Sequence, residues 1–156
     1  MSAAPHDSAE LDSQRLRAAG LRVTAPRLAV LAAVRAGDHL AVGDIAVSAR
    51  ERTGSISTQA IYDVLAALVR VGLARQIQPA GGPARFETRV DDNHHHIICR
   101  SCRVAVDVDC VLSKAPCLEP PQTAGFVIDE TELIFWGVCP ACQRGPLPTV
   151  ASTGRF

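Results

Sequence analysis

The 156-residue sequence has no net charge, because 16 lysine and arginine residues are matched by 16 aspartate and glutamate residues. It has no apolar run long enough to cross a membrane, and residues 1–12 lack the charged-then-apolar pattern of a signal peptide. We therefore expect a cytoplasmic protein with no membrane partner, in a compartment where thiols stay reduced. The sequence has no HExxH or related catalytic motif, which argues against a zinc hydrolase.

Zero net charge argues against a nucleic-acid partner, but the charge is unevenly distributed. Residues 1–90 carry 11 arginines and 8 acidic residues, a net of +3. Residues 91–156 carry 5 basic and 8 acidic residues, a net of −3. The chain therefore has a mildly basic part and an acidic part, and the acidic part carries most of the cysteines and histidines. This division indicates that the two parts have different functions.

Caps and apolar spacing predict four helices after a loose leader at residues 1–8. Thr24 and Ser57 are good N-cap residues, and Gly54 and Gly72 are good stops. The most regular apolar spacing is Ile61, Val64, Leu65, Leu68 and Val71. The expected helices cover residues 11–19, 25–36, 42–52 and 58–71.

Two short alternating segments, residues 74–78 and 85–88, follow the fourth helix and are joined by a Pro/Gly-rich turn, which predicts a β-hairpin. Helices followed by a hairpin are typical of a winged helix-turn-helix domain, although other helical bundles share the pattern. In a winged helix the fourth helix would enter the major groove of DNA by its N-terminal end. The residues at that end are Ser57, Thr58, Gln59 and Tyr62.

The rest of the chain predicts a smaller, strand-rich domain. Residues 91–93 break the pattern and are the expected hinge between a DNA-binding domain at 1–90 and a second domain at 94–142. Short β-type runs cover residues 96–99, 104–108, 126–128 and 133–138. Prolines between Cys110 and Gly125 argue against a long helix there, and residues 143–156 have the composition of a flexible tail. The fold class is therefore α+β.

Two CxxC turns provide the strongest chemical signal: Cys99 with Cys102, and Cys139 with Cys142. Each turn places two thiolates within reach of one tetrahedral ion, so together they predict a closed, structural zinc site. Separate redox pairs are the alternative, but a thioredoxin-like CxxC lies at the start of a helix after a strand, and neither pair clearly does.

Three consecutive histidines precede the first CxxC turn. On an extended chain His94 and His96 point to one face and His95 to the other. Further ligands for the first pair are His39, Glu87 and Asp107, and such a set suits Fe2+, Mn2+, Co2+ or Zn2+. A surface His triplet without function is the alternative. Cys110 and Cys117 are either ordinary small residues or redox-active thiols.

Together, several segments resemble the ferric uptake regulator (Fur) family, from about residue 11 to residue 142. They are residues 21–27 (LRVTAPR), 59–65 (QAIYDVL), 84–87 (ARFE), 94–102 (HHHIICRSC) and 137–142 (GVCPAC).

The resemblance implies a homodimer with a winged-helix reading head and an α/β dimerisation domain. It implies a non-enzymatic repressor that takes no small-molecule substrate and, when loaded with metal, binds a palindromic double-stranded operator. Arg22 would lie near the DNA and Tyr62 would be the recognition-helix tyrosine. The resemblance assigns structural Zn2+ to Cys99, Cys102, Cys139 and Cys142, and regulatory Fe2+ (or Zn2+ or Mn2+) to His39, Glu87, His94, His96 and Asp107.

The sequence departs from the family pattern at one position of the recognition helix and at the additional metal site. Asp63 stands where many relatives carry arginine, and an acid there repels phosphate, so operator preference should differ. His95 fits the family's additional metal site, but the other positions hold Lys114 and Thr131. A third site would therefore need other ligands, such as Asp109, Cys110 or Glu130.

The residue 62–65 run and the extra cysteines look most like actinobacterial Fur-like repressors of catalase-peroxidase genes, which implies iron and oxidative-stress control. Zinc-uptake control and thiol or peroxide sensing are the alternatives. Glu87 stands where relatives that sense peroxide by iron-catalysed oxidation carry aspartate, which argues against that mechanism.

Overall fold

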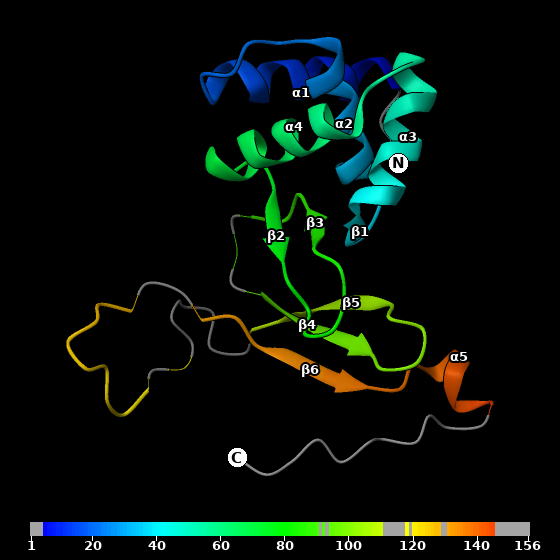
Figure 1. Cartoon of the computed structure of the whole chain (residues 1–156). Helices are drawn as coiled ribbons and strands as arrows, with labels where there is room; N and C mark the ends of the chain where they lie inside the picture. Colours follow the sequence, from blue (N-terminus) through cyan, green and yellow to red (C-terminus); the bar gives the residue numbers. More distant parts are fainter. Residues whose placement is uncertain are drawn as a thin grey trace. The chain divides into compact units, whose positions relative to one another are not determined.

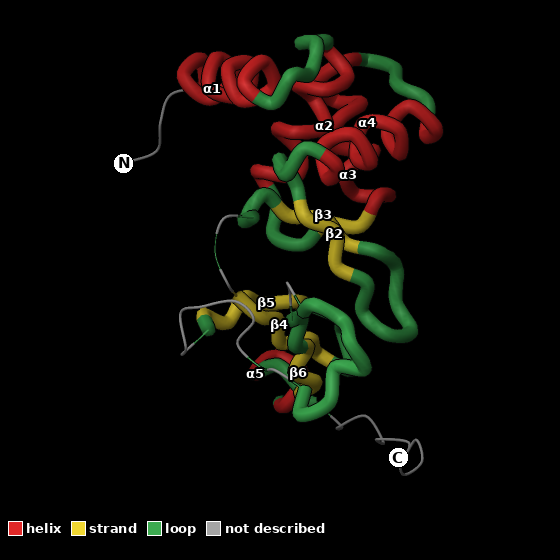
Figure 2. Tube along the Cα trace, turned by 90° about the vertical axis from the view of Figure 1, so that its left-hand side faces the viewer, coloured by secondary structure: helices red, strands yellow, loops and turns green. Residues whose placement is uncertain are grey.

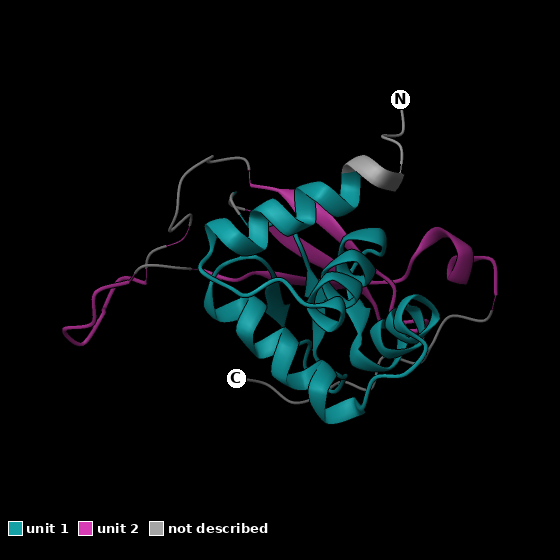
Figure 3. Cartoon of the chain, turned by 90° about the horizontal axis from the view of Figure 1, so that it is seen from above, with its two compact units in different colours: residues 1–92 teal, residues 93–156 magenta. Residues whose placement is uncertain are grey.

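The computed structural model describes residues 5–90, 92, 94–110, 118, 120–128 and 131–145. The chain divides into two compact units, residues 1–92 and 93–156 (Figure 3). Within the described ranges, no helix has both the length and the apolar character to span a membrane. Three parts of the sequence-based prediction lie outside the described residues: residues 91 and 93 of the expected hinge, Cys117, and residues 146–156 of the expected tail.

Unit 1 contains four helices, which Figure 1 labels in chain order. They are α1 (Pro5–Ala18), α2 (Ala25–Ala36), α3 (Val42–Thr53) and α4 (Thr58–Arg70). The last three match the predicted bounds to within a residue or two. The prediction of a loose leader at residues 1–8 is wrong for residues 5–8, because α1 begins at Pro5, a residue whose fixed φ suits a first helical turn. Residues 1–4 lie outside the described residues.

Side-chain caps begin two of these helices where the sequence predicts. The Thr24 hydroxyl accepts a hydrogen bond from the Arg27 backbone N–H, and the Ser57 hydroxyl accepts one from that of Ala60. Gly54 ends α3 at a φ of +77°, in the region that glycine adopts without steric cost. These local signals set the bounds of α2, α3 and α4.

The core of unit 1 forms where α2, α3 and α4 pack together. The apolar stripe of α4 is buried as its spacing predicts, apart from the partly buried Val71 at its end. The completely buried aliphatic side chains of this core that are larger than alanine are Leu16, Val30, Leu31, Val34, Ile45, Ile61 and Leu68. The opposite face of α4 is thereby left exposed.

Helix α1 contributes a buried apolar side chain to the core and forms an ion pair with α2. Leu16 is fully buried in the core. Asp12 is 1% exposed, and its two carboxylate oxygens accept hydrogen bonds from Nε and Nη2 of Arg35 on α2 at 3.1–3.3 Å. The guanidinium therefore pairs with the carboxylate through two nitrogens, a geometry that favours strong binding.

The predicted hairpin is present as β2 (Arg75–Ile77) and β3 (Arg85–Glu87), which pair antiparallel (Figure 2). A two-residue strand that the sequence does not predict, β1 (Leu40–Ala41), pairs with the other edge of β3 and completes the sheet β1-β3-β2. Its register places Leu40 opposite Phe86, so His39 lies next to Glu87. Unit 1 is thus a winged helix-turn-helix domain.

Unit 2 is built on a mixed sheet in the order β5-β4-β6. Strands β4 (His94–Cys99) and β5 (Ala105–Asp109) form an antiparallel hairpin, and β6 (Ile134–Gly137) runs parallel to β4 (Figure 1). A short helix, α5 (Pro140–Gln143), follows β6. The strand expected at residues 126–128 is absent: Phe126 and Val127 are 75% and 93% exposed and are assigned to no strand.

Candidate metal centres and DNA-binding surface

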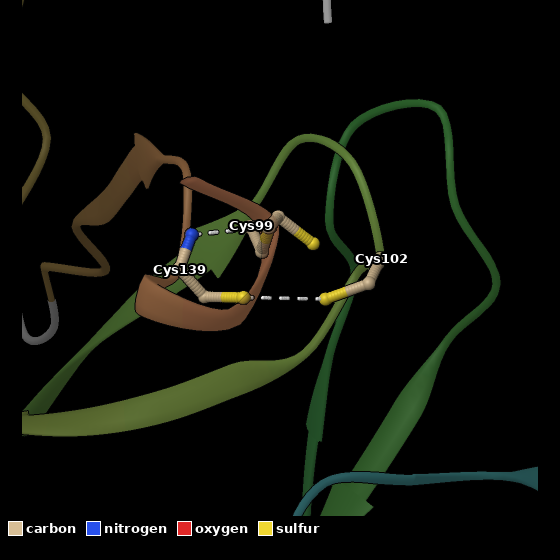
Figure 4. Close-up of side chains that lie close together, drawn as sticks. Cys99, Cys102 and Cys139 are labelled. Carbon is tan, nitrogen blue, oxygen red and sulfur yellow. Dashed lines mark hydrogen bonds between the residues drawn. The ribbon is translucent and has the colours of Figure 1, made fainter. Parts of the chain in front are cut away.

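The two CxxC turns meet at one end of the sheet in unit 2. The four sulfur atoms all lie within 4.8 Å of one another, and they belong to Cys99, Cys102, Cys139 and Cys142. The Sγ atoms of Cys102 and Cys139 are 3.7 Å apart and point toward each other (Figure 4). Two sulfurs bound to one tetrahedral zinc ion at about 2.3 Å lie about 3.8 Å apart. The cluster therefore has the composition and spacing of a four-thiolate zinc site.

The fold of unit 2 brings these cysteines together. Cys99 ends β4, and the tight turn to β5 is closed by a 3.0 Å hydrogen bond from the Arg103 N–H to the Cys99 carbonyl. Arg103 adopts a φ of +64° in that turn. Cys139 follows β6, the parallel neighbour of β4, and its backbone N–H points at the Cys99 sulfur at 3.4 Å (Figure 4).

The second CxxC pair corrects one sequence-based argument. Cys139 follows a strand and is the N-cap residue of α5, with Pro140 in the first turn. This is the position of a thioredoxin-like motif, which the sequence did not reveal because α5 has only four residues. All four thiols nevertheless converge on one point, which is the arrangement of a metal site rather than of two separate redox pairs.

Hydrogen bonding and crowding give the thiols unequal acidities. The backbone N–H groups of Cys102 and Cys139 lower the pKa of Cys99 to about 6. At Cys102 the Val104 N–H lowers the pKa, but the Cys99 thiol, desolvation and the remaining thiols outweigh it and raise the pKa to about 11. Four crowded thiols thus do not all ionise at neutral pH, and a bound dication removes that conflict.

Two arginine side chains contact one tryptophan ring beside the cysteine cluster, an arrangement that the sequence does not predict. The guanidinium carbons of Arg100 and Arg103 lie 5.4 and 5.7 Å from the ring centroid of Trp136. These are cation–π distances. Arg100 lies within the first CxxC turn and Arg103 directly follows it, whereas Trp136 on β6 precedes the second turn. The contacts therefore link the two segments that carry the CxxC turns.

Unit 1 contributes one set of metal-type ligands at the β1–β3 pairing. His39 Nε2 lies 2.8 Å from a carboxylate oxygen of Glu87. Arg85, also on β3, donates a 2.9 Å hydrogen bond to the His39 carbonyl. His39 adopts a φ of +56°, an uncommon conformation outside glycine that is often found at functional positions. The sequence indicates both residues as ligands but does not predict the strand that pairs them.

Unit 2 contributes a second set on one face of the β4–β5 hairpin. The register places His96 directly opposite Asp107, and His94 shares that face two residues earlier. The two imidazole rings are 5.0 Å apart, and their Nε2 atoms lie 3.9 Å (His94) and 3.7 Å (His96) from the same oxygen of Asp107. Ligand atoms about 2.1 Å from one tetrahedral ion are about 3.4 Å apart, so this set needs little movement to bind a metal.

His95 and Cys110 are not part of these sets. His95 pairs in register with Val108, on the opposite side of β4 from His94 and His96. Cys110 follows β5, is partly exposed and forms no disulfide with the described cysteines.

The N-terminal end of α4 carries the predicted DNA-binding residues, and several make hydrogen bonds within the protein. The Ser57 hydroxyl is used as the helix cap. The Thr58 hydroxyl accepts a 3.1 Å bond from Arg50 on α3, and the side-chain amide of Gln59 donates a 2.8 Å bond to Asp63. Tyr62 is 51% exposed.

Arg22 lies apart from this helix. It is exposed in the loop between α1 and α2, and its carbonyl accepts a hydrogen bond from Arg27.

These features define a class: a winged helix-turn-helix protein with a separate sheet unit that carries a four-cysteine cluster of the metal-binding kind. Comparison with known proteins identifies the family. A sequence model described as "Ferric uptake regulator family" matches residues 18–135. The chain is 53% identical over 131 residues to the transcriptional regulator FurA of Mycobacterium tuberculosis, covering 84% of this chain and 89% of that protein.

Two further comparisons agree. Ferric uptake regulation protein 1 of Mycolicibacterium fortuitum is 51% identical over 121 residues, which cover 78% of this chain and 75% of that protein. The crystal structure of the Vibrio cholerae ferric uptake regulator superposes with a TM-score of 0.65 at 22% identity, covering 81% and 98% of the two chains. The chain belongs to the ferric uptake regulator family and is a transcriptional regulator.

Proposed function

We propose that the protein is a homodimeric, metal-dependent repressor that binds double-stranded operator DNA in the cytoplasm and is not an enzyme. Residues 1–90 would read the DNA, residues 91–93 would act as a hinge, and residues 94–142 would bind metal and dimerise. The observation that carries this proposal is a winged-helix unit and a sheet unit that each hold a set of metal-type ligands, in a chain of this family.

Zn2+ is the ion proposed for Cys99, Cys102, Cys139 and Cys142. Thiolate ligands in a tetrahedral, closed set favour structural zinc. Among the described residues of unit 2, the only buried apolar side chains are Ile98, Cys99 and Ala105. A small core of this kind gains much of its folding free energy from a bound ion.

The regulatory ion is proposed to be Fe2+, with Zn2+ or Mn2+ as alternatives. His39 and Glu87 would supply ligands from unit 1, and His94, His96 and Asp107 from unit 2. Such an ion would fix the DNA-binding unit relative to the dimer core, so that both heads match the operator half-sites. Without it, ordering the heads would cost binding free energy.

Anaerobic fluorescence anisotropy on the protein's own promoter DNA tests this proposal. The zinc-loaded protein should bind tightly with Fe2+ and weakly without it. The double variant His94→Ala/His96→Ala should lose the response to Fe2+. His6→Ala, which removes the one histidine outside the two sets and His95, is the matched control and should behave as the wild type does. A double variant that binds as tightly as the wild type would overturn the regulatory site.

Cys99→Ser tests the structural ion separately. We expect loss of bound zinc, measured by native mass spectrometry, together with loss of the dimer in sedimentation. A stable, dimeric, zinc-free variant would disprove the assignment.

Control of iron and oxidative-stress genes, including catalase-peroxidase genes, is the proposed physiological role. The 51% identity to ferric uptake regulation protein 1 of Mycolicibacterium fortuitum supports the iron-regulator class. Thiol-based peroxide sensing is a second candidate, because Cys139 is the N-cap residue of α5 and hydrogen bonding from the Cys142 backbone lowers its pKa. Peroxide titrated into the anisotropy samples distinguishes the two: release of DNA together with zinc favours the thiol mechanism, and release that requires Fe2+ with zinc retained favours metal chemistry.

A further inference from the structure

Helix α4 presents a narrow exposed stripe, polar except for one alanine, on the side opposite its buried face. The buried face carries Ile61, Val64, Leu65 and Leu68. The exposed stripe, at spacings of three and four residues, consists of Gln59, Tyr62, Asp63, Ala66 and Arg70. If α4 is the recognition helix, its N-terminal residues face the base edges, and Gln59 in the first turn is the amide-bearing side chain among them.

The start of α4 is held rigidly. Arg50 on α3 donates hydrogen bonds from Nε to the Ile56 carbonyl at 3.2 Å and from Nη2 to the Thr58 hydroxyl at 3.1 Å. Ser57 caps the helix from its own side chain. The backbone that carries Gln59 is therefore fixed by both the turn before it and the helix after it.

The Gln59 side chain is oriented by Asp63, four residues later. Its Nε2 donates a 2.8 Å hydrogen bond to Asp63 Oδ1. A glutamine amide alone can rotate so that donor and acceptor exchange places. An ionised carboxylate only accepts hydrogen bonds, so Asp63 holds the nitrogen end of the amide on its own side.

We propose that Gln59 reads adenine in the major groove and that Asp63 is the residue that orients it. Adenine presents the N7 acceptor and the N6 amino donor on its major-groove edge, and a glutamine amide matches both. The amide nitrogen has two hydrogens, so one bonds Asp63 and the other remains for N7, while Oε1 accepts from N6. The inference rests on the proposed DNA-binding function and adds the identity of one operator base.

This arrangement explains why an acid is placed on a DNA-facing surface. A carboxylate near phosphates weakens sequence-independent binding, because that binding depends on positive charge. An oriented amide strengthens discrimination between bases. Asp63 should therefore lower the affinity for random DNA and raise the discrimination between bases. Substitution of a purely structural residue would lower both the affinity and the discrimination.

The test uses full-length, metal-loaded protein and duplexes selected by the wild type from a randomised library. We expect the selected half-site to contain an adenine that discriminates about 5- to 100-fold against other bases. Gln59→Ala should abolish that preference without changing the salt dependence. Asp63→Asn should reduce the preference and bind random duplex more tightly than the wild type. Glu51→Gln removes the same charge from an exposed site on α3 and is the control, with the base preference unchanged.

Three results would overturn the inference. One is an unchanged base preference in Gln59→Ala. Another is a loss of affinity and specificity together in Asp63→Asn. The third is a cytosine preference that depends on Asp63 and not on Gln59, since a carboxylate can accept directly from cytosine N4. In each case the wild type still binds DNA, so failure of the inference is distinguishable from failure of the proposed function, in which no duplex is selected.

Discussion

The ion pair between Asp12 and Arg35 should carry much of the attachment of α1, and its two partners should not be equivalent. The Asp12 side chain is 1% exposed, whereas that of Arg35 is 34% exposed. Arg35→Met leaves a buried carboxylate with no cation, which costs about 2–4 kcal/mol after allowing for water that enters on the exposed side. Asp12→Asn keeps the shape and an acceptor, and lets Arg35 turn to water, so it should cost only about 1–2 kcal/mol.

Urea denaturation of the two single variants and the double variant forms a thermodynamic cycle that measures the coupling. Far-ultraviolet circular dichroism follows unit 1, because the four long helices lie there. Fluorescence of the single tryptophan, Trp136, follows unit 2 as an internal control and should not shift. We expect a coupling of about 1–2 kcal/mol. Equal costs for the two single variants, or a cost for Arg35→Met below about 1 kcal/mol, would refute the reasoning from unequal burial.

Three further predictions concern the cysteine cluster and the start of α4. Adding Zn2+ to metal-free protein at neutral pH should release protons, including one from Cys102, whose pKa is about 11. Fewer than four protons should be released, because Cys99, with a pKa of about 6, is already largely ionised. Zinc affinity should therefore fall as the pH falls, and a pH-indicator titration that counts no released protons would contradict this prediction. Removing the ion should shift the fluorescence of Trp136, and Arg100→Ala should speed zinc loss to a chelator more than Arg100→Lys, which keeps the cation over the ring. Arg50→Met should raise amide exchange in the first turn of α4, measured by mass spectrometry, at a cost of about 1–2 kcal/mol and with exchange in α2 unchanged.

The sequence predicted those parts of the fold that local signals determine. Thr24 and Ser57 mark helix starts because each side chain bonds a backbone N–H three residues later. The CxxC spacing likewise predicted that four thiols would meet, since metal geometry restricts where such pairs can lie.

The missed features depend on contacts between distant residues. Strand β1 has two residues and exists because β3 offers it an edge, so the pairing of His39 with Glu87 was not predictable from either segment. Residues 126–128 are apolar and combine an aromatic with two β-branched side chains, yet they form no strand, because strand propensity has little effect without a neighbouring strand. Arg50 carries no sequence signal at all, since its role arises from the turn between two helices.

Strand β4 begins at His94 and ends at Cys99. Five steps of about 3.3 Å separate these residues by roughly 17 Å, so neither end can lend ligands to the other. The same strand nevertheless joins the two ligand sets: its register with β5 places His96 opposite Asp107, and hydrogen bonds in the turn after Cys99 close that hairpin. We therefore expect zinc to bind the cysteines before the proposed regulatory ion binds the histidines, and to leave after it. A cell short of zinc would then lose the response to the regulatory ion although all the ligands of that ion are still present.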